Sequence, residues 1–384
     1  MEYQNARHIL PPELIERIQQ YFQGGYLYIP ASGPAKSASH QTAYQTELEK
    51  RNGRIYQKYL RGWSSRRLAE HYSLSVSSIR RILQNQRKDA QAMEKSIIQV
   101  LRFWGLEELG ILQREENVWE IDGKYMLKAY TDLSSLERNI RILTILHKNG
   151  IPTAQVIPVS PEYPWVSREN RFYLLTTKLE GSHYDGAVTE SIARSMGQTL
   201  AALHLAFQSC QNQLTLWDNS LLQELSGWIF AQLDADGWKL LPKALFDEIY
   251  SALAALYPRL NVQLIHRDVH FGNFLFSGET FTGYIDFDLS QKNIRIFDLC
   301  YFLAGLLARE TGAQMGLPWS RIVRETVDAY DRINPLTSEE KSAIPLVMQA
   351  IELLFAGYFL SIQDTVCAAD AIRVLHRIRE ELAQ

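Results

Sequence analysis

The spacing of hydrophobic residues changes along the chain and predicts three kinds of region. Apolar side chains recur at helical spacing in the first 88 residues, and a polar stretch over 84–94 follows. Short apolar runs of strand length then appear from residue 109, and the chain beyond residue 179 returns mostly to helical spacing. The pattern predicts a helical N-terminal domain over 1–88, a small mixed lobe over 95–178 and a large helical lobe over 179–384.

The N-terminal pattern is that of a helix-turn-helix. We expect helices over 11–21 and 42–61, with a short strand over 26–30 and a flexible turn over 31–39 between them. Ser64 or Ser65 can cap a third helix, and Ser75 can cap a fourth. In that fourth helix Val76, Ile79 and Leu83 lie on the inner face, as a recognition helix requires.

The mixed lobe is predicted from five apolar runs and one amphipathic helix. Its helix is expected over 134–147, and two further strand-like pieces lie in the helical lobe, over 262–265 and 284–285. The five runs of the lobe are 109–112, 118–121, 125–130, 155–159 and 172–177. A small sheet lobe followed by a large helical lobe predicts a cleft between them.

Composition favours a reduced, soluble setting. The 384 residues are 46% hydrophobic and 22% charged, which is typical of globular proteins. We find no signal peptide and no uninterrupted apolar run long enough to cross a bilayer, the longest candidate being 299–308. Three widely spaced cysteines, Cys210, Cys300 and Cys367, do not form a disulfide framework. We therefore expect a cytoplasmic protein with no membrane partner.

Charge separates the N-terminal domain from the rest. The net charge of the chain is -3, yet residues 51–88 contain ten basic residues and only one acidic residue, Glu70. Such a basic segment indicates a polyanionic partner. Four exposed residues of the fourth helix are the candidate DNA contacts: Ser77, Ser78, Arg80 and Arg81. A merely solvated face, or a small helical docking module, is the alternative interpretation.

Candidate chemistry lies in two segments of the helical lobe, His266-Arg-Asp-Val-His-Phe-Gly-Asn273 and Tyr284-Ile-Asp-Phe-Asp288. They provide a carboxylate (Asp268), a carboxamide (Asn273) and a second carboxylate (Asp286) after an apolar run. Phosphoryl transfer needs a carboxylate to accept the proton of the attacking hydroxyl and oxygen ligands for Mg²⁺. Taken singly, Asp and Asn are turn residues and His266 is a buried core histidine. The joint pattern favours the catalytic interpretation.

On these motifs, residues 97–380 resemble the aminoglycoside phosphotransferase and choline kinase superfamily, which has a protein-kinase-like fold. The resemblance implies an ATP- or GTP-dependent kinase that uses Mg²⁺ and a small-molecule hydroxyl acceptor. It implies that Asp268 is the catalytic base and that Asn273 and Asp286 are the metal ligands. It places the phosphate-binding lysine at Lys128, with Glu137 as its ion-pair partner. His266, Asp288 and Asp298 are its structural or supporting residues, Asp298 bracing the catalytic loop.

Several positions depart from that pattern or allow two interpretations. Arg267 stands where bacterial relatives commonly have glycine, and the segment 114–119 before the second strand has no glycine to cover phosphates. Glu137 also completes a capping box with Ser134. Asp288 touches either the metal or the groups around it, and His270 lies either near the transferred phosphate or in packing. We expect His204 to be structural and adenine to lie against residues 176–179.

Residues 3–85 resemble the Mor-like transcription activator family, most clearly in the stretch 23–30 and in the helix-turn-helix. This resemblance implies DNA binding and a homodimer formed through the N-terminal part. We therefore expect a multidomain chain, with an all-α helix-turn-helix domain followed by an α+β bilobal protein-kinase-like domain. The first function hypothesis is a small-molecule kinase. The second is a transcriptional regulator whose kinase-like domain senses a ligand or nucleotide.

Overall fold

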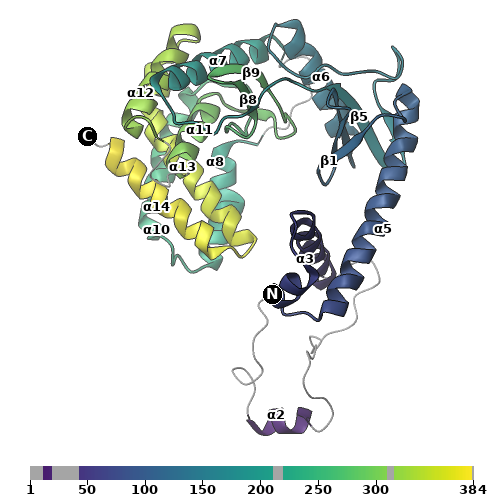
Figure 1. Cartoon of the computed structure of the whole chain (residues 1–384). Coiled ribbons are helices and arrows are strands. Elements are labelled where there is room, and N and C mark those ends of the chain that lie inside the picture. Colours follow the sequence, from purple (N-terminus) through teal and green to yellow (C-terminus); the bar gives the residue numbers. More distant parts are fainter. Residues whose placement is uncertain (1–11, 20–42, 211–218, 309–314, 383–384) are drawn as a thin grey trace. The chain divides into compact units, whose positions relative to one another are not determined.

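The structure is a computed structural model and describes residues 12–19, 43–210, 219–308 and 315–382 (Figure 1). The chain divides into two compact units, residues 1–92 and 93–384. The strand predicted over 26–30 and the turn predicted over 31–39 lie outside the described residues.

The described part of the first unit is helical. Its helices enclose a small core that includes Ile55, Leu68 and Ile79. The polar stretch 84–94 is helical as well, because it contains strong helix formers and neither glycine nor proline. The helices are α2 (Pro12–Gln19), α3 (Ala43–Leu60), α4 (Ser65–His71) and α5 (Val76–Leu101), and the last of these continues into the second unit.

Serine side chains cap the first turns of α4 and α5. The Ser64 hydroxyl accepts a hydrogen bond from the backbone N–H of Arg67, and the Ser75 hydroxyl accepts one from the backbone N–H of Ser78. Ser73 takes up a left-handed backbone with φ of 52°. Serine adopts this conformation less readily than glycine, so the left-handed backbone at Ser73 costs some free energy of folding.

The second unit begins with an antiparallel five-stranded sheet in the order β1-β2-β3-β5-β4. Lys128 lies in β3, opposite Val118 of β2 and Leu174 of β5. The small-lobe elements are β1 (Ile111–Glu115), β2 (Val118–Ile121), β3 (Tyr125–Tyr130), α6 (Leu133–Lys148), β4 (Val166–Arg168) and β5 (Arg171–Thr177).

The strand predicted over 155–159 is wrong, and β4 takes its place at the edge of the sheet. The segment forms only a bridge between Val156 and Thr176, supported by backbone hydrogen bonds from Ile157 to Leu175 and from Thr177 to Gln155. Pro158 has no N–H to continue the ladder, so the pairing stops there.

The large lobe is helical around two small antiparallel ribbons, the two-stranded β10-β7 and the three-stranded β6-β8-β9. Its strands are β6 (Ser182–His183), β7 (Val262–Ile265), β8 (Phe274–Ser277), β9 (Thr280–Tyr284) and β10 (Gln291–Ile294). Its helices are α7 (Glu190–Cys210), α8 (Leu221–Glu224), α9 (Phe230–Ala235), α10 (Lys243–Leu256), α11 (Ile296–Ala308), α12 (Trp319–Ile333), α13 (Ser338–Ser361) and α14 (Thr365–Leu382). A π-helical turn, Leu225–Ile229, joins α8 to α9, and short 3₁₀ turns cover Arg102–Trp104 and Tyr257–Arg259.

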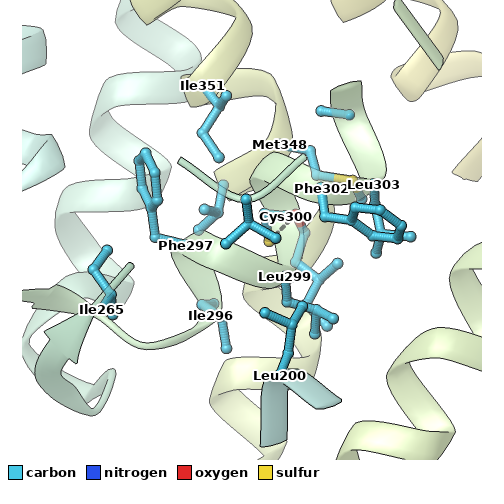
Figure 2. Close-up of a cluster of buried hydrophobic side chains, with 14 of the residues drawn as sticks. Leu200, Ile265, Ile296, Phe297, Leu299, Cys300, Phe302, Leu303, Met348 and Ile351 are labelled. Atoms are coloured by element: carbon cyan, nitrogen blue, oxygen red, sulfur yellow. Dashed lines mark hydrogen bonds between the residues drawn. The ribbon is translucent and has the colours of Figure 1, made fainter. Parts of the chain in front are cut away.

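Helix α11 lies in the centre of the large-lobe core. Figure 2 shows Leu299, Phe302 and Leu303 of α11 packed among side chains that include Leu200 and Met348. Ten of the 13 residues of α11 are buried, so the helix is firmly held. The polar residues that α11 carries are therefore fixed in position.

Among the described residues, α13 is the one helix long and apolar enough to cross a membrane by length and composition. The predicted stretch 299–308 is still the longer uninterrupted apolar run, because Gln349 and Glu352 fall within the 18-residue window of α13 that meets this criterion. In the structure 61% of that window is buried inside the large lobe. Burial on this scale is typical of a core helix of a folded domain.

Candidate active site

Two loops meet between the ribbons of the large lobe. The loop 266–273 connects β7 to β8, and the loop 285–290 connects β9 to β10. Ile265 pairs with Gln291, and Phe274 pairs with Tyr284. A backbone hydrogen bond from Ile285 to Asn273 joins the loops directly. This topology brings both predicted catalytic segments to one place, although Asn273 and Ile285 are 12 positions apart in the sequence.

Asp298, in the first turn of α11, holds the first loop. Its two carboxylate oxygens accept hydrogen bonds from the backbone N–H groups of His266 and Arg267, each at 2.8 Å. His204 Nε2 lies 3.1 Å from the same carboxylate and is completely buried with it. Asp298 and His204 therefore lie where a structural role requires them.

The backbone at Arg267 is left-handed, with φ of 76°. Glycine adopts this conformation more readily than arginine does. Arg267 Nη2 donates to both carboxylate oxygens of Glu224, at 2.8 and 2.9 Å. The guanidinium also lies 5.0 Å from the ring centre of Phe297. This pair ties the loop 266–273 to α8, and the sequence alone offered no signal for it.

Asp268 is surrounded by hydrogen-bonding side chains. Tyr301 Oη donates to its Oδ1 at 2.9 Å, and Asn273 Nδ2 donates to its Oδ2 at 2.9 Å. His270 Nε2 lies 3.4 Å from Oδ2, while its Nδ1 accepts the backbone N–H of Gly272. Burial acts to raise the pKa of Asp268, but the His270, Tyr301 and Asn273 contacts outweigh it and lower the pKa to about 2. Asp268 is an oriented carboxylate at neutral pH.

The two histidines of the loop 266–273, His266 and His270, differ in their surroundings. His266 is completely buried, and its Nε2 lies 3.2 Å from the carbonyl oxygen of Ile285. Burial lowers the pKa of His266, against the opposing effect of Asp298. His270 is partly exposed beside Asp268. His266 thus links the two loops from inside, whereas His270 lies beside the Asp268 carboxylate.

Lys128 points from β3 toward the second loop. Its Nζ lies 3.1 Å from Asp286 Oδ1 and 2.7 Å from Asp288 Oδ2. Burial acts to lower the pKa of Lys128, but Tyr130 and the two carboxylates outweigh it and raise the pKa. Asp286 has a left-handed backbone with φ of 62°, which turns the chain sharply after β9.

The predicted pair between Lys128 and Glu137 is not present. Glu137 is exposed, whereas the buried face of α6 includes Leu136, Asn139 and Leu143. The predicted capping box is wrong too, because the Asp132 side chain caps α6 by accepting the backbone N–H of Ser135. The helix begins one residue earlier than predicted, and Glu137 falls on its outer face.

Asn139 and Tyr130 are site residues that the sequence reasoning missed. Asn139 Nδ2 donates to Asp288 Oδ1 at 3.1 Å, and Tyr130 Oη donates to the same oxygen at 3.3 Å. Asn139 Nδ2 also reaches Tyr130 Oη. The signal available was one polar residue on the otherwise apolar inner face of a predicted helix. Tyr301, embedded in the apolar run of α11, offered no comparable signal.

A hollow of about 440 Å³ adjoins this cluster. The turn between β1 and β2 forms one wall, and Lys128, Tyr130, Ser135 and Asp288 line the other side. Although the turn contains no glycine, its backbone leaves room beside the lysine. This is the place where a kinase-like fold holds nucleotide phosphates.

The site residues fit a magnesium ion. Asn273 uses its Nδ2 for Asp268, which leaves the carbonyl oxygen Oδ1 for a metal. Asp286 is nearly half exposed, and a cation, the Lys128 ammonium, already lies on its Oδ1. No group of three or more His, Cys, Asp or Glu residues capable of holding a metal occurs within the described ranges. Mg²⁺ needs only one or two protein oxygens when phosphates complete its coordination.

The N-terminal unit presents a second polar surface. Ser77, Arg80 and Arg81 are exposed on α5 and Ser78 is half-buried. Two hollows of about 430 and 420 Å³ lie beside α5, one lined by Arg80, Arg87 and Lys88 and the other by Arg51 and Arg81. Arg87 donates to Tyr59 Oη. Within the described part of the unit, Arg80 and Arg81 have no acidic partner.

Fold and site together define a kinase-like phosphotransferase, and comparison with known proteins agrees. The model of the phosphotransferase enzyme family matches residues 111–336, and the chain belongs to that family. It is a kinase with an alcohol group as acceptor. The homoserine kinase of Methylobacillus glycogenes is 24% identical over 239 residues, which cover 61% of this chain and 71% of the relative. The predicted aminoglycoside phosphotransferase resemblance is confirmed at the level of the family.

Solved structures share the fold. Wild-type aminoglycoside 2'-phosphotransferase-IIIa in its GDP complex superposes with a TM-score of 0.55 at 14% identity, over 76% of this chain and 99% of that one. The amicoumacin kinase hAmiN, in complex with AMP-PNP, Ca²⁺ and Ami, superposes with a TM-score of 0.51 at 18% identity, over 77% and 95%. At these identities the likeness shows the α+β kinase-like fold.

A shorter relative matches a smaller part of this chain. The uncharacterised protein YraL of Bacillus subtilis is 33% identical over 88 residues, which are 22% of this chain and 97% of YraL. This chain is therefore similar to YraL over almost the whole length of YraL.

Proposed function

We propose that the second unit transfers the γ-phosphate of ATP or GTP to the hydroxyl of a small molecule, with Asp268 as the base. The observation that carries this is the joint placement of Asp268, Asn273, Asp286 and Lys128 around two joined loops. Asp268 accepts the proton of the attacking hydroxyl, and Tyr301 and Asn273 keep its carboxylate oriented while it does so.

Lys128 binds the phosphates beside the β1–β2 turn. Asn273 and Asp286 would hold Mg²⁺, which supplies charge neutralisation of the phosphate oxygens. The backbone N–H groups of Thr177 and Lys178 already donate to Gln155 and Lys124, so adenine contacts other groups of the segment 176–179. The relatives include homoserine kinases and an aminoglycoside phosphotransferase. Hydroxylated amino acids, amino alcohols and aminoglycosides therefore form the first acceptor panel.

The experiment is turnover by the full chain with Mg·ATP across that panel, followed by Asp268→Asn. Removal of the base should lower kcat at least about 100-fold with any accepted substrate. Calorimetric binding of Mg·ADP should stay within a few-fold, because Asp268 faces the acceptor. The matched control is Asp328→Asn, an exposed acid on α12, which should retain full turnover. Wild-type kcat in the Asp268→Asn protein would end the assignment.

We further propose that the N-terminal unit binds DNA through α5. The exposed, unpaired Arg80 and Arg81 beside two basic hollows favour this interpretation over a merely solvated face. The YraL match of 88 residues has about the length of this 92-residue unit, which supports a separable module. The helix-turn-helix identity, the Mor-like assignment and the homodimer belong to this proposal, and most of residues 1–42 lies outside the described ranges.

Electrophoretic mobility shifts of duplex DNA with the full chain, at several salt concentrations, test the DNA proposal. Phosphate contacts predict an affinity that falls steeply with salt. Binding that is absent or insensitive to salt would make the unit a protein-docking module. If turnover is absent while DNA binding responds to nucleotide, the regulator hypothesis takes the place of the kinase.

A further inference from the structure

We propose that Asp288 is the acidic partner that positions Lys128 for the nucleotide phosphates, and that Asn139 and Tyr130 hold Asp288 in place. The inference rests on the proposed kinase function and deepens it. It replaces the predicted Lys128–Glu137 pair with a cluster built from three elements: β3, α6 and the loop after β9. Asp288 acts through Lys128 and is therefore a positioning residue.

The two carboxylates near Lys128 are not equivalent. Asp288 Oδ2 lies 2.7 Å from Lys128 Nζ, and Asp286 Oδ1 lies 3.1 Å from it. Asp286 is also assigned to the metal, and a carboxylate that serves a metal is a weaker partner for an ammonium group. Asp288 is less exposed, 33% against 46%. Asp288 is thus the partner that Lys128 can keep throughout the reaction.

The hydrogen bonds of Asp288 divide its two oxygens by function. Oδ2 pairs with the charged Lys128, while Oδ1 accepts from two neutral donors, Asn139 and Tyr130. Asn139 is buried on the inner face of α6, and Tyr130 is buried at the end of β3. Because both donors are fixed by packing, the carboxylate has one orientation, and Lys128 is directed along it.

Glu137 cannot take this role without loss of the α6 packing. Glu137 and Asn139 are two residues apart, which places them about 200° apart around a helix with 3.6 residues per turn. Leu136 and Leu143, on the same side as Asn139, are buried. A rotation that brought Glu137 to Lys128 would expose these leucines to water and would disconnect Asn139 from Asp288.

The test is Mg·ADP binding to the full chain by calorimetry, comparing Asp288→Asn with Glu137→Gln. Both changes remove one charge and keep the side-chain size. Asp288→Asn should weaken binding on the order of ten-fold, as expected for loss of a charge-assisted hydrogen bond that orients the lysine. Glu137→Gln should stay within two-fold. In turnover assays Asp288→Asn should raise KM for ATP and leave KM for the acceptor unchanged, a split that general destabilisation would not produce.

Two further variants test the cluster itself. Tyr130→Phe removes only the hydroxyl and should weaken Mg·ADP binding a few-fold, while thermal melting shows that the fold is intact. The double variant Lys128→Met with Asp288→Asn should bind Mg·ADP no more weakly than Lys128→Met alone, because Asp288 acts through the lysine. Weakened binding in Glu137→Gln with normal binding in Asp288→Asn would overturn the inference. Absence of nucleotide binding in the unchanged protein would instead end the proposed kinase function.

Discussion

The two units of this protein treat their charged residues in opposite ways. In the N-terminal unit Arg80 and Arg81 are exposed, and within its described residues they have no acidic partner. In the second unit Glu224, Asp298 and Glu340 are buried, and each meets a cation or several N–H groups. Burying a charge costs free energy unless it is paired. Unpaired surface cations suit a polyanion, whereas paired internal charges fix the geometry of a site.

Replacing one of these paired internal charges, in Asp298→Asn, should have the largest effect on stability. An amide in place of the carboxylate cannot accept both backbone N–H groups of the catalytic loop, and His204 loses its charged partner. We expect stability to fall by about 3 kcal/mol or more and kcat with an accepted substrate to fall at least ten-fold. Urea unfolding and turnover measure both effects. Unchanged values in this variant would show that α11 does not brace the loop.

Arg267→Gly sets two opposing effects against each other. Glycine relieves the left-handed backbone, worth about 1 kcal/mol. It also leaves the buried Glu224 carboxylate without its guanidinium, at about 3–5 kcal/mol. The second effect is larger, so the unfolding free energy should drop. Adding Glu224→Gln to this variant should recover a good part of the loss, and a stabilised single variant would contradict the pairing argument.

Glu352 is a buried carboxyl group on α13, and within the described structure its Oε1 has no hydrogen-bond partner. Burial raises its pKa from the ordinary value of 4.5 to about 8. Between these values the folded chain keeps a proton that the unfolded chain has released, so stability falls as pH rises, by up to about 1.4 kcal/mol per pH unit.

Glu352→Gln removes this titration. The variant should match the unchanged protein near pH 5 and unfold at a higher urea concentration near pH 9. Urea curves at pH 5, 7 and 9 measure the difference. Parallel pH dependence in the two proteins would show that Glu352 ionises normally in the fold.

Arg80→Ala with Arg81→Ala should have the smallest effect on stability, within about 0.5 kcal/mol, because neither side chain is buried or paired. If both contact phosphates, the slope of log affinity for duplex DNA against log salt should fall by about two. Arg259→Ala with Arg324→Ala, two exposed arginines of the second unit, is the matched control. Equal slopes in both double variants would remove α5 from the DNA proposal.

Local patterns predicted the elements that depend on nearby residues. Strands β2 and β3 have the predicted bounds because their apolar runs are short and bordered by turn residues. The strand predicted over 155–159 does not form because Pro158 lacks the N–H that would continue the ladder, and strand propensity takes no account of this. The pair Lys128–Glu137 failed because its outcome depends on the rotation of α6, which a cap at Asp132 and the packing of Leu136 and Leu143 decide together.

The sequence by itself determined the candidate catalytic residues, since Asp268, Asn273 and Asp286 stand out by spacing and residue type within two short segments. It also determined the basic character of residues 51–88. Only the tertiary structure decided which residues support the candidate catalytic residues. Tyr301 reaches Asp268 across 33 residues, and Lys128 reaches Asp286 across 158 residues. Contacts of this kind depend on how the helices and strands pack, and residue spacing along a chain carries no record of that packing.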